Sequence, residues 1–383
     1  MSDPIIRTAR KEDFVGLLEL LMAAFSDGSP AHARLDQLMP ETIRPTEAIL
    51  DNWHIAVDGA KVIASTQIVA QRFAVAPGVE IRVGGIGQVS CMPGFRGKGL
   101  MTSLLDASIA RMTKDGYHVS ILGGDRRRYR QFGWEIAGCV RSLHMNTRRI
   151  GAAMVLPAED NRPVRCMGDH ATANCIHETY QKNPSRQLRT REETGLILQR
   201  LNLATWVHRV GSEFAYIVLN GNQIAEYGGD EETFEQLLCF LLTRSGLSVT
   251  APAIEGSGRL EEIMESCAYN YVLQPVDMIR IFSLKSLLEA YHSALEKRLA
   301  NWQGKVVLRV EDGEASESVQ VSRDGAGMTI GATTAKADLS LDRPTWATTL
   351  FGPFTGRITN AEMAAFIRQI TNLPIVWPLT SQV

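Results

Sequence analysis

The spacing of apolar residues near the N-terminus predicts a strand, a helix and a β-hairpin in that order. Residues 5–7 fit a short strand, and the apolar side chains of residues 14–25 recur at helical spacing, which predicts an amphipathic helix. The apolar runs 53–57 and 62–70 flank Asp58-Gly59. Because Asp-Gly is typical of tight two-residue turns, these runs are expected to pair as a hairpin.

A third strand, a glycine-rich loop and a second helix are expected next. Residues 86–92 fit a strand, and apolar residues from Leu100 to Met112 recur at helical spacing. Gly116 is expected to follow the end of this helix, since glycine readily adopts the left-handed conformation found there. Another strand is expected at 118–122. Together these elements predict an α/β unit over residues 1–150.

The same order of elements recurs in the middle of the chain. Residues 214–219 and 223–227 predict a second hairpin, residues 234–242 a helix, and residues 247–251 a strand. The helix is preceded by Gly-Gly-Asp-Glu-Glu at 228–232, which is acidic. Acidic residues stabilise a helix N-terminus but repel an anionic ligand. A second copy of the first unit would therefore have lost its anion site.

The last part of the chain predicts helices around several short strands. Ser283 is expected to cap a helix that extends to Leu299, and Thr359 to Glu362 has the pattern of a capping box for a helix ending at Ile370. Four short strands are expected between these helices, at residues 306–311, 318–322, 328–330 and 337–341.

Composition excludes several classes of function. The 383 residues are 45% hydrophobic and 21% charged, with a formal net charge of −2. This near-neutral balance gives no support for a nucleic-acid partner. The N-terminus lacks the basic and apolar regions of a signal peptide, and no apolar run is long enough to span a bilayer. We therefore expect a cytoplasmic protein with no membrane partner.

The six cysteines are dispersed and contain no C-x-x-C pair, so we expect free thiols rather than a disulfide framework. Cys166, His170, Cys175 and His177 lie close together in the sequence, but their spacing matches no familiar zinc arrangement. Cys175 and His177 would also point to different faces of a predicted helix. We expect no metal site.

The loop before the second helix is the strongest candidate for chemistry. Gly97 and Gly99 allow the backbone to approach a ligand closely, and Arg96 and Lys98 add positive charge. The first helical turn, Leu100-Met101-Thr102, offers N–H groups that have no partner within the helix. This combination predicts an anion site that suits a pyrophosphate. The loop contains neither a Walker sequence nor G-x-G-x-x-G.

This loop resembles the acetyl-CoA loop of the GNAT acetyltransferases, [QR]-x-x-G-x-[GA]. Arg96, Gly99 and Met101 fill its fixed places, although Met101 is larger than the residue usual at the last one. After the next strand, the stretch from Tyr129 to Trp134 resembles the Y-x-x-F-G-[FYW] ending of the same family. Both motifs occur in the expected order and spacing.

The domain order extends the resemblance over the whole chain. Residues 336–342 with 350–352 resemble sterol carrier protein-like domains, and the chain as a whole resembles the Eis-type (enhanced intracellular survival) N-acetyltransferases. The resemblance implies an α/β (α+β) fold of two tandem GNAT-like domains, the second degenerate, followed by a sterol carrier protein-like α+β domain. The expected boundaries are 1–150, 151–275 and 276–383. A homo-oligomer is also implied, often a hexamer of two trimers.

The resemblance implies acetyl transfer from acetyl-CoA to an amine by direct attack. Such a reaction needs a neutral amine, a stabilised oxyanion and a proton for the leaving thiolate. The backbone N–H groups of Ser90, Cys91 and Met92 are implied to bind the thioester carbonyl, and Tyr129 to protonate the thiolate. Arginines 126–128 would lower the pKa of this phenol, bind CoA phosphates, or lie on a solvated turn.

The implied base is the α-carboxylate of Val383. The family tends to end on an aromatic residue, whereas this chain ends on Ser-Gln-Val. A frayed terminus, with water or another carboxylate as the base, is therefore the alternative.

Two further functions remain open. The first is a binding protein whose tail domain carries a lipid or other apolar ligand. The second is a regulator that binds acetyl-CoA without turnover. No residue identifies the acceptor, which is a small-molecule amine, an aminoglycoside or a protein lysine.

Overall fold

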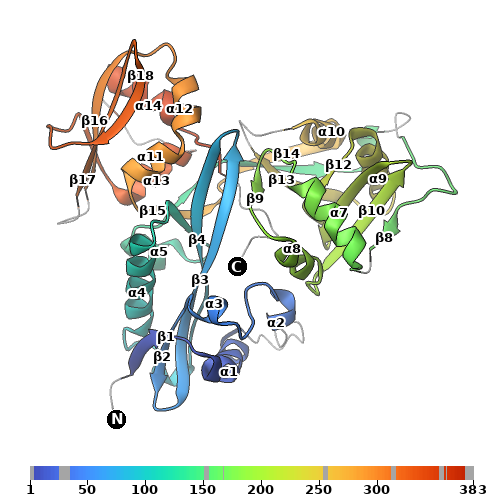
Figure 1. Ribbon diagram of the computed structural model, residues 1–383, viewed down its shortest axis with the longest axis horizontal. Coiled ribbons are helices and arrows are strands. Elements are labelled where there is room, and N and C mark those ends of the chain that lie inside the picture. Colours follow the sequence, from blue (N-terminus) through green and yellow to red (C-terminus); the bar gives the residue numbers. More distant parts are fainter. Residues whose placement is uncertain are drawn as a thin grey trace.

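The computed structural model describes residues 4–25, 35–150, 155–166, 168–252, 258–311, 316–352, 358 and 360–375. In these ranges the chain forms three β-sheets, each with helices packed against it, arranged as three lobes (Figure 1). A long hairpin of β3 (Lys61–Ala76) and β4 (Val79–Cys91) stands between the lobes. None of the helices in the described ranges has the length and apolar character needed to cross a bilayer.

The first sheet has eight strands in the order β1-β2-β3-β4-β5-β15-β6, with β9 paired to β3. Besides β3 and β4 these strands are β1 (Ile5–Thr8), β2 (Trp53–Asp58), β5 (Val119–Leu122), β6 (Glu135–Ala137), β9 (Arg186–Gln187) and β15 (Asp277–Ile281). Neighbours are antiparallel except β4 and β5, which are parallel. The predicted hairpin is confirmed, but β3 extends beyond residue 70 to Ala76 because Phe73 and Val75 are buried against the third lobe.

Two helices cover opposite faces of this sheet, and both are confirmed where the sequence predicts them. They are α1 (Phe14–Phe25) and α4 (Leu100–Lys114). Ile55 packs in the same cluster as residues of α1, whereas its neighbour Ala56 packs with residues of α4. Successive residues of a strand point to opposite faces, so the two helices lie on opposite sides of the sheet.

The second sheet repeats this topology. Its order is β14-β7-β13-β12-β11-β10-β8. The strands are β7 (Val140–Met145), β8 (Val164–Arg165), β10 (Leu203–Val210), β11 (Glu213–Asn220), β12 (Gln223–Gly229), β13 (Leu247–Pro252) and β14 (Ala268–Gln274). Here β12 and β13 are the parallel pair, and α9 (Glu231–Leu242) connects them as α4 connects β4 to β5. The predicted second hairpin, helix and strand are therefore confirmed.

The two sheets exchange one strand each. β7 follows β6 in the sequence but pairs with β13 and β14 of the second sheet, whereas β15 follows β14 but pairs with β5 and β6 of the first. The register continues through the crossing, since Val140 pairs with Gln274 and Ala137 with Asp277. Residues 135–145 and 268–281 thus form one antiparallel ribbon that passes through both sheets. The segment 268–281 crosses the expected limit at 275, and β7 belongs to the second sheet although it lies before the expected limit at 150.

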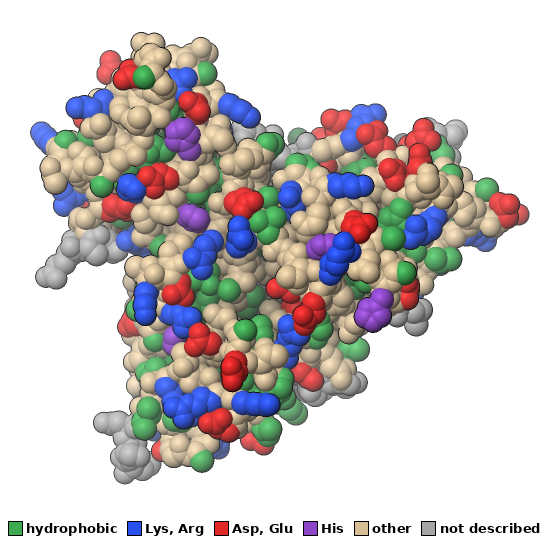
Figure 2. Space-filling model, in the orientation of Figure 1, with side chains coloured by type: hydrophobic (Ala, Val, Ile, Leu, Met, Phe, Trp, Pro, Cys, Tyr) green, Lys and Arg blue, Asp and Glu red, His purple; other side chains and the backbone are tan. Residues whose placement is uncertain are grey.

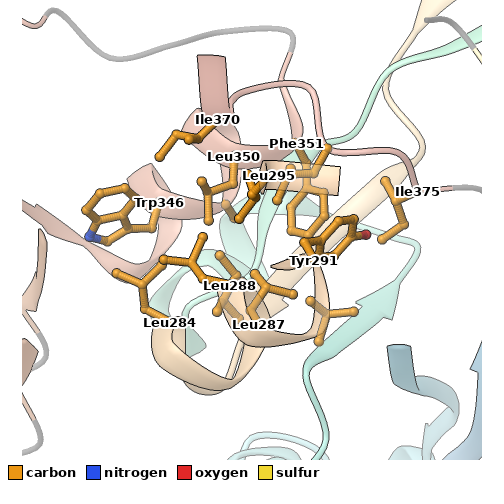
Figure 3. Packing of buried hydrophobic residues seen from close by; sticks show 14 of the residues in the cluster. Leu284, Leu287, Leu288, Tyr291, Leu295, Trp346, Leu350, Phe351, Ile370 and Ile375 are labelled. Carbon is orange, nitrogen blue, oxygen red and sulfur yellow. The ribbon is translucent and has the colours of Figure 1, made fainter. Parts of the chain in front are cut away.

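The third lobe has a four-stranded sheet in the order β18-β17-β16-β19. Its elements are β16 (Gly304–Glu311), β17 (Glu317–Asp324), β18 (Gly327–Ala332), β19 (Leu339–Asp342), α11 (Leu284–Ala290), α12 (His292–Arg298), α13 (Arg343–Phe351) and α14 (Ala361–Ile370). Leu287, Leu288, Trp346, Leu350 and Phe351 are fully buried in one core (Figure 3). The same cluster includes residues of β3 and β4, so this lobe packs directly on the first sheet.

Two predictions for this lobe need correction. The single helix expected after Ser283 is interrupted at Tyr291, whose φ of −89° and ψ of 9° leave the helical region. The Tyr291 hydroxyl donates to the carbonyl oxygen of Pro374 (2.7 Å). The cap of α14 is Asn360, whose side chain accepts from the N–H of Met363 (3.0 Å). Thr359, the predicted cap, lies outside the described residues.

The remaining helices are short connections or pack on the second sheet. They are α2 (Leu35–Leu38), α3 (Glu47–Leu50), α5 (Arg126–Tyr129), α6 (Thr147–Ile150), α7 (His170–Tyr180), α8 (Arg191–Leu198) and α10 (Arg259–Cys267). All six cysteines are free, as expected, although only Cys239 and Cys267 are buried. Cys175 and His177 make separate contacts, with Arg209 and Thr194 respectively.

The crossing of the ribbon depends on a glycine. Gly138 has φ +86°, and a Cβ there would lie 2.5 Å from Cγ2 of Val276. Gly138→Ala should therefore lower the free energy of unfolding by about 2–4 kcal/mol, through backbone strain and this clash together. Urea denaturation followed by circular dichroism measures the loss.

The control is Gly211→Ala, because Gly211 also has a positive φ (+61°) but nothing within 4 Å of its Cβ position. It should lose only about 1 kcal/mol. Equal losses in the two variants would show that the crossing tolerates a side chain at residue 138.

Candidate active site

β4 and β5 diverge after a short paired segment. They pair at three positions, from Val83 with Val119 to Gly85 with Ile121. β4 continues to Cys91, whereas β5 ends at Leu122. Beyond Gly85, the edge of β4 that faces β5 has no strand partner within the described ranges. Main-chain groups on that edge face an opening between the two strands.

A β-bulge lies in the diverging part of β4. Gln88 has φ +53°, a conformation that is uncommon for residues other than glycine. The register with β3 shifts between Ser65 and Gln67 at the same place. The Ser65 hydroxyl donates to the carbonyl of Gln88 (3.1 Å), and its oxygen lies 2.8 Å from the hydroxyl oxygen of Ser90. These buried contacts hold the bulge against β3.

The end of β4 presents one main-chain donor to the opening. The N–H of Met92 donates to the carbonyl of Ile63 (2.8 Å) in β3. Hydrogen-bonded and non-hydrogen-bonded pairs alternate along an antiparallel ladder, so the N–H of Ser90 also points to β3 and that of Cys91 points away from it. The carbonyl of Cys91 accepts from Nε of Arg96 (3.3 Å) on the same side. Of the three predicted donors, only Cys91 therefore faces the diverging strand.

The glycine loop leads from β4 into α4 through a 3₁₀ turn at Pro93–Phe95. Gly97 and Gly99 both have φ +76°, and a Cβ at either position would meet nothing within 4 Å. Gly99 is the N-cap of α4 and supplies no side chain to cap it. The first N–H groups of the helix are thus left for a ligand.

A pocket of about 570 Å³ lies over this loop. The end of α1, β4, the loop, the first turn of α4 and Arg128 form its walls. The lining residues are Ala24, Phe25, Val89, Ser90, Cys91, Phe95, Arg96, Gly97, Gly99, Leu100, Met101, Thr102 and Arg128. Eight of the ten residues that the sequence predicts as cofactor-binding are among them. The other two are Met92, whose N–H is bound to β3, and Lys98, whose Nζ lies 4.8 Å from the centroid of the Phe95 ring.

A buried polar chain fixes α4 against the sheet. The hydroxyl oxygen of Ser108 lies 2.9 Å from that of Thr66 in β3 and 3.1 Å from Nδ1 of His54 in β2. Burial lowers the pKa of His54, so the neutral imidazole is the form that takes part in this chain. Since all three side chains are buried, their contacts fix the position of α4 relative to the diverging strands.

Tyr129 lies on the other side of the opening, in the segment that follows β5. Asp125 caps α5 by accepting from the N–H of Arg127 (2.9 Å), and Tyr129 ends this short helix. The Tyr129 ring is buried in a cluster that also contains Leu122 and, partly buried, the pocket residue Met101. Burial raises the pKa of the phenol, although Arg128 acts in the opposite direction. No hydrogen-bond partner of its hydroxyl occurs among the residues that the structure describes.

The three arginines before Tyr129 do not share one role. Arg126 forms two hydrogen bonds with Glu135 (2.5 and 2.7 Å), and Arg130 adds another (2.8 Å). Burial opposes ionisation of Glu135, but these bonds outweigh it, and the pKa of Glu135 is lowered. Arg128 instead lines the pocket. The sequence left these roles open because it does not show which arginine faces the acidic partner.

Two carboxylates bear on the choice of base. Val383, the predicted base, lies outside the described residues. Asp277, which the sequence did not single out, begins β15 beside the end of β5. Burial raises the pKa of Asp277 to about 6. No local signal marks this residue, since its place depends on the strand exchange.

The start of α9 in the second unit corresponds to the start of α4, but acidic rather than basic residues predominate there. A smaller pocket of about 210 Å³ lies at the start of α9 and is lined by the acidic residues Asp230, Glu231 and Glu261 together with Lys182 and Arg259. Glu231 pairs with Arg259 (3.3 Å), and the carboxylate of Asp230 accepts from the N–H of Phe214 (2.8 Å). This helix start therefore lacks the surplus of cations that surrounds the start of α4. On the face of the molecule in Figure 2, basic and acidic side chains are intermingled.

Comparison with known proteins assigns the first unit to a family. Residues 5–137 match the acetyltransferase (GNAT) domain family, so the chain contains a GNAT acetyltransferase domain. A comparison with curated protein sequences finds no match.

Solved structures match the chain over almost its full length. A protein of Enterococcus faecalis V583, described as a probable N-acyltransferase, is 18% identical with a TM-score of 0.70, and 98% of each chain is covered. Eis1 from Mycobacterium abscessus is 15% identical with a TM-score of 0.64, covering 99% of this chain and 100% of that one. A GCN5-related N-acetyltransferase from Kribbella flavida is 14% identical with a TM-score of 0.65, covering 98% and 97%. At these identities the likeness shows the fold alone.

The paired Glu135 should stabilise the segment that carries Tyr129. Glu135→Gln should lower the free energy of unfolding at neutral pH by about 1–2 kcal/mol, a modest value because both arginines are half exposed. The folded pKa lies below the usual 4.5, so the stabilisation is present above that pH and is lost as the pH falls through the folded pKa. Urea midpoints of wild type and variant should converge in acid.

Glu80→Gln is the control, since its ion pair with Arg72 has more than half of each side chain exposed. It should change stability by less than about 0.5 kcal/mol at any pH. A pH-independent deficit in Glu135→Gln would contradict the role of the ionised carboxylate.

Proposed function

We propose that this protein is an Eis-type N-acetyltransferase that transfers the acetyl group of acetyl-CoA to a primary amine by direct attack in a ternary complex. One observation carries the proposal: the pocket of about 570 Å³ is built from the glycine loop, the first turn of α4 and the diverging end of β4. Its position within a domain that matches the GNAT acetyltransferases supports the same reading.

The pocket residues fit the parts of acetyl-CoA in order. Main-chain N–H groups from Gly97 to Thr102 would bind the pyrophosphate, since the open loop and the helix dipole favour an anion there. Arg96 and Arg128 would add charge from two sides. The N–H of Cys91 would donate to the thioester carbonyl and stabilise the oxyanion that forms during attack. No metal takes part in this proposal.

The amine attacks the thioester carbon, and the sulfur leaves as a thiolate that needs a proton. Tyr129 would supply it. Burial in an apolar cluster keeps the phenol protonated at neutral pH, which a proton donor requires. The α-carboxylate of Val383 is the base that the family resemblance implies, with water or another carboxylate as the alternative.

We further propose the domain order that the resemblance implies, with boundaries 1–150, 151–275 and 276–383. The second domain is a degenerate GNAT-like copy, supported by its identical strand order and by the acidic start of α9. The third is sterol carrier protein-like, and the assembly is a homo-oligomer, with a hexamer as the expected state. The alternatives of a lipid carrier or a non-catalytic regulator gain no support from the third lobe, whose central apolar side chains pack against one another.

A charge placed in the pocket should abolish acetyl-CoA binding. Thr102 is exposed on the first turn of α4, so Thr102→Glu adds a carboxylate where the pyrophosphate would lie and leaves the fold intact. We expect the dissociation constant for acetyl-CoA to rise about tenfold or more by like-charge repulsion. Isothermal titration calorimetry measures it.

Ser103→Glu adds the same charge one residue further along the same turn but outside the pocket lining. It should bind acetyl-CoA within about threefold of wild type. Failure of the wild type to bind acetyl-CoA would overturn the proposed function.

Loss of the Tyr129 hydroxyl should affect turnover but not binding. Tyr129→Phe keeps the ring in its apolar cluster and should lower kcat by about 10²–10³-fold. Its affinity for acetyl-CoA should not change. Thiol release in the presence of n-butylamine, spermidine or kanamycin measures kcat, and a variant that turns over at the wild-type rate would exclude Tyr129 as the acid.

A further inference from the structure

The edge strand β14 of the second sheet carries a run of exposed apolar side chains. Tyr269, Tyr271, Val272 and Leu273 are between 45% and 59% exposed. The other large apolar side chains with such exposure in the described ranges occur singly or as one adjacent pair. Isolated exposed apolar residues are normal on a protein surface, whereas a contiguous group marks an interaction surface.

β14 pairs with a strand on one side only. It is the terminal strand of its sheet and is bonded to β7, and its outer edge has no strand partner among the residues that the structure describes. The register with β7 shifts between Ala268 and Asn270 and is regular from Asn270 to Gln274. Along this regular segment, alternate residues leave their N–H and C=O groups on the outer edge. Such an edge is a template for a further strand.

The regular part of β14 lacks the features by which sheet edges avoid further pairing. Edge strands that stay unpaired are normally short, charged or interrupted by proline. Residues 270–274 contain no charged residue and no proline. Arg141 of β7, which is opposite Leu273, is already bound to Glu265 of α10 (2.9 Å). The strand at the other edge of the same sheet, β8, is by contrast only two residues long.

Both faces of β14 are exposed along this segment. Tyr271 pairs with Leu143, which is buried in the core that contains α9, so Tyr271 and Leu273 lie on the helix-covered face of the sheet. Asn270 and Val272 lie on the opposite face and are also exposed. A helix or a loop would cover one of these faces. A strand added to the edge places its side chains beside those of both faces at once.

We propose that a second copy of this chain supplies this strand, with residues 270–274 of the two copies paired antiparallel about a two-fold axis at Val272. A two-fold interface requires a surface that matches itself. The opposed pairs would be Asn270 with Gln274, Tyr271 with Leu273, and Val272 with its own copy. Amides thus meet amides and apolar side chains meet apolar side chains at every position. This inference rests on the proposed homo-oligomer and names one of its interfaces.

The exposed apolar area is sufficient for a specific contact between two copies. Covering Tyr269, Tyr271, Val272 and Leu273 in both copies would remove about 1,000 Å² from water, which is the lower limit for a specific protein–protein interface. Main-chain hydrogen bonds between the two strands would add to this contact and fix its register.

The test places charges at the two residues that are expected to face each other. Tyr271→Glu combined with Leu273→Glu sets like charges opposite each other across the axis, and should reduce the mass in solution to half that of wild type. Tyr271→Lys combined with Leu273→Glu sets opposite charges there and should keep the wild-type mass. Sedimentation velocity measures the mass. Both residues are exposed, so both variants should keep the circular dichroism spectrum of wild type.

A disulfide tests the position of the axis. Residues directly opposite in an antiparallel pair have Cα atoms about 4.5–5.5 Å apart, within the range that a disulfide spans. Val272→Cys should therefore give a covalent dimer on a non-reducing gel after mild oxidation. Val164→Cys is the matched control, because Val164 is 60% exposed on β8 at the other edge of the same sheet. It should give no more covalent dimer than wild type.

The possible results separate the interface from the assembly and from the chemistry. A wild-type oligomer whose mass does not change in the Tyr271→Glu, Leu273→Glu variant, with no covalent dimer from Val272→Cys, would overturn this interface alone. A wild type that sediments as a monomer would overturn the interface together with the proposed homo-oligomer, and would assign the edge of β14 to a partner other than a second copy. Acetyl-CoA binding and thiol release test the proposed acetyl transfer independently of either result.

Discussion

The antiparallel ribbon formed by residues 135–145 and 268–281 is the constraint on which the remaining structure depends. A strand that leaves its sheet must find new partners for its N–H and C=O groups. Here each crossing segment supplies them for the other, and the register is kept from one sheet to the next. Neither sheet is complete without a strand from the other unit. The two units therefore form one cooperative structure.

The ribbon also determines what surrounds the candidate site. It places Met278 in the apolar cluster that holds Tyr129 and, by the alternation of strand residues, places Asp277 on the opposite face. The third lobe adds a second restraint, since one core joins α11, α12 and α13 to β3, β4, β5 and β15. Residues contributed by segments far apart in the sequence thus hold the short turn after β5.

Local signals in the sequence were sufficient for most elements but not for their assembly. The helices of residues 14–25 and 100–114 and the hairpin at Asp58-Gly59 have periodic patterns that do not depend on distant partners. The glycine loop was identified for the same reason. In contrast, β7 and β15 are short runs whose choice of sheet follows from pairing across the whole chain, and no periodicity encodes it. Asp277 was missed because its neighbours are supplied by this pairing, and Arg128 could not be separated from Arg126 without knowing where Glu135 lies.

Two carboxylates on neighbouring strands have pKa values that are shifted in opposite directions. Glu135 and Asp277 are on β6 and β15, which pair directly, yet two arginines lower the pKa of the first and burial without a cation raises the pKa of the second. The arginines of the neighbouring segments contact Glu135 and main-chain carbonyls. A partly buried carboxylate with no cationic partner among the described residues destabilises the folded state once it is ionised. Adjacent titratable groups whose environments move their pKa values apart are the arrangement from which acid–base chemistry is made.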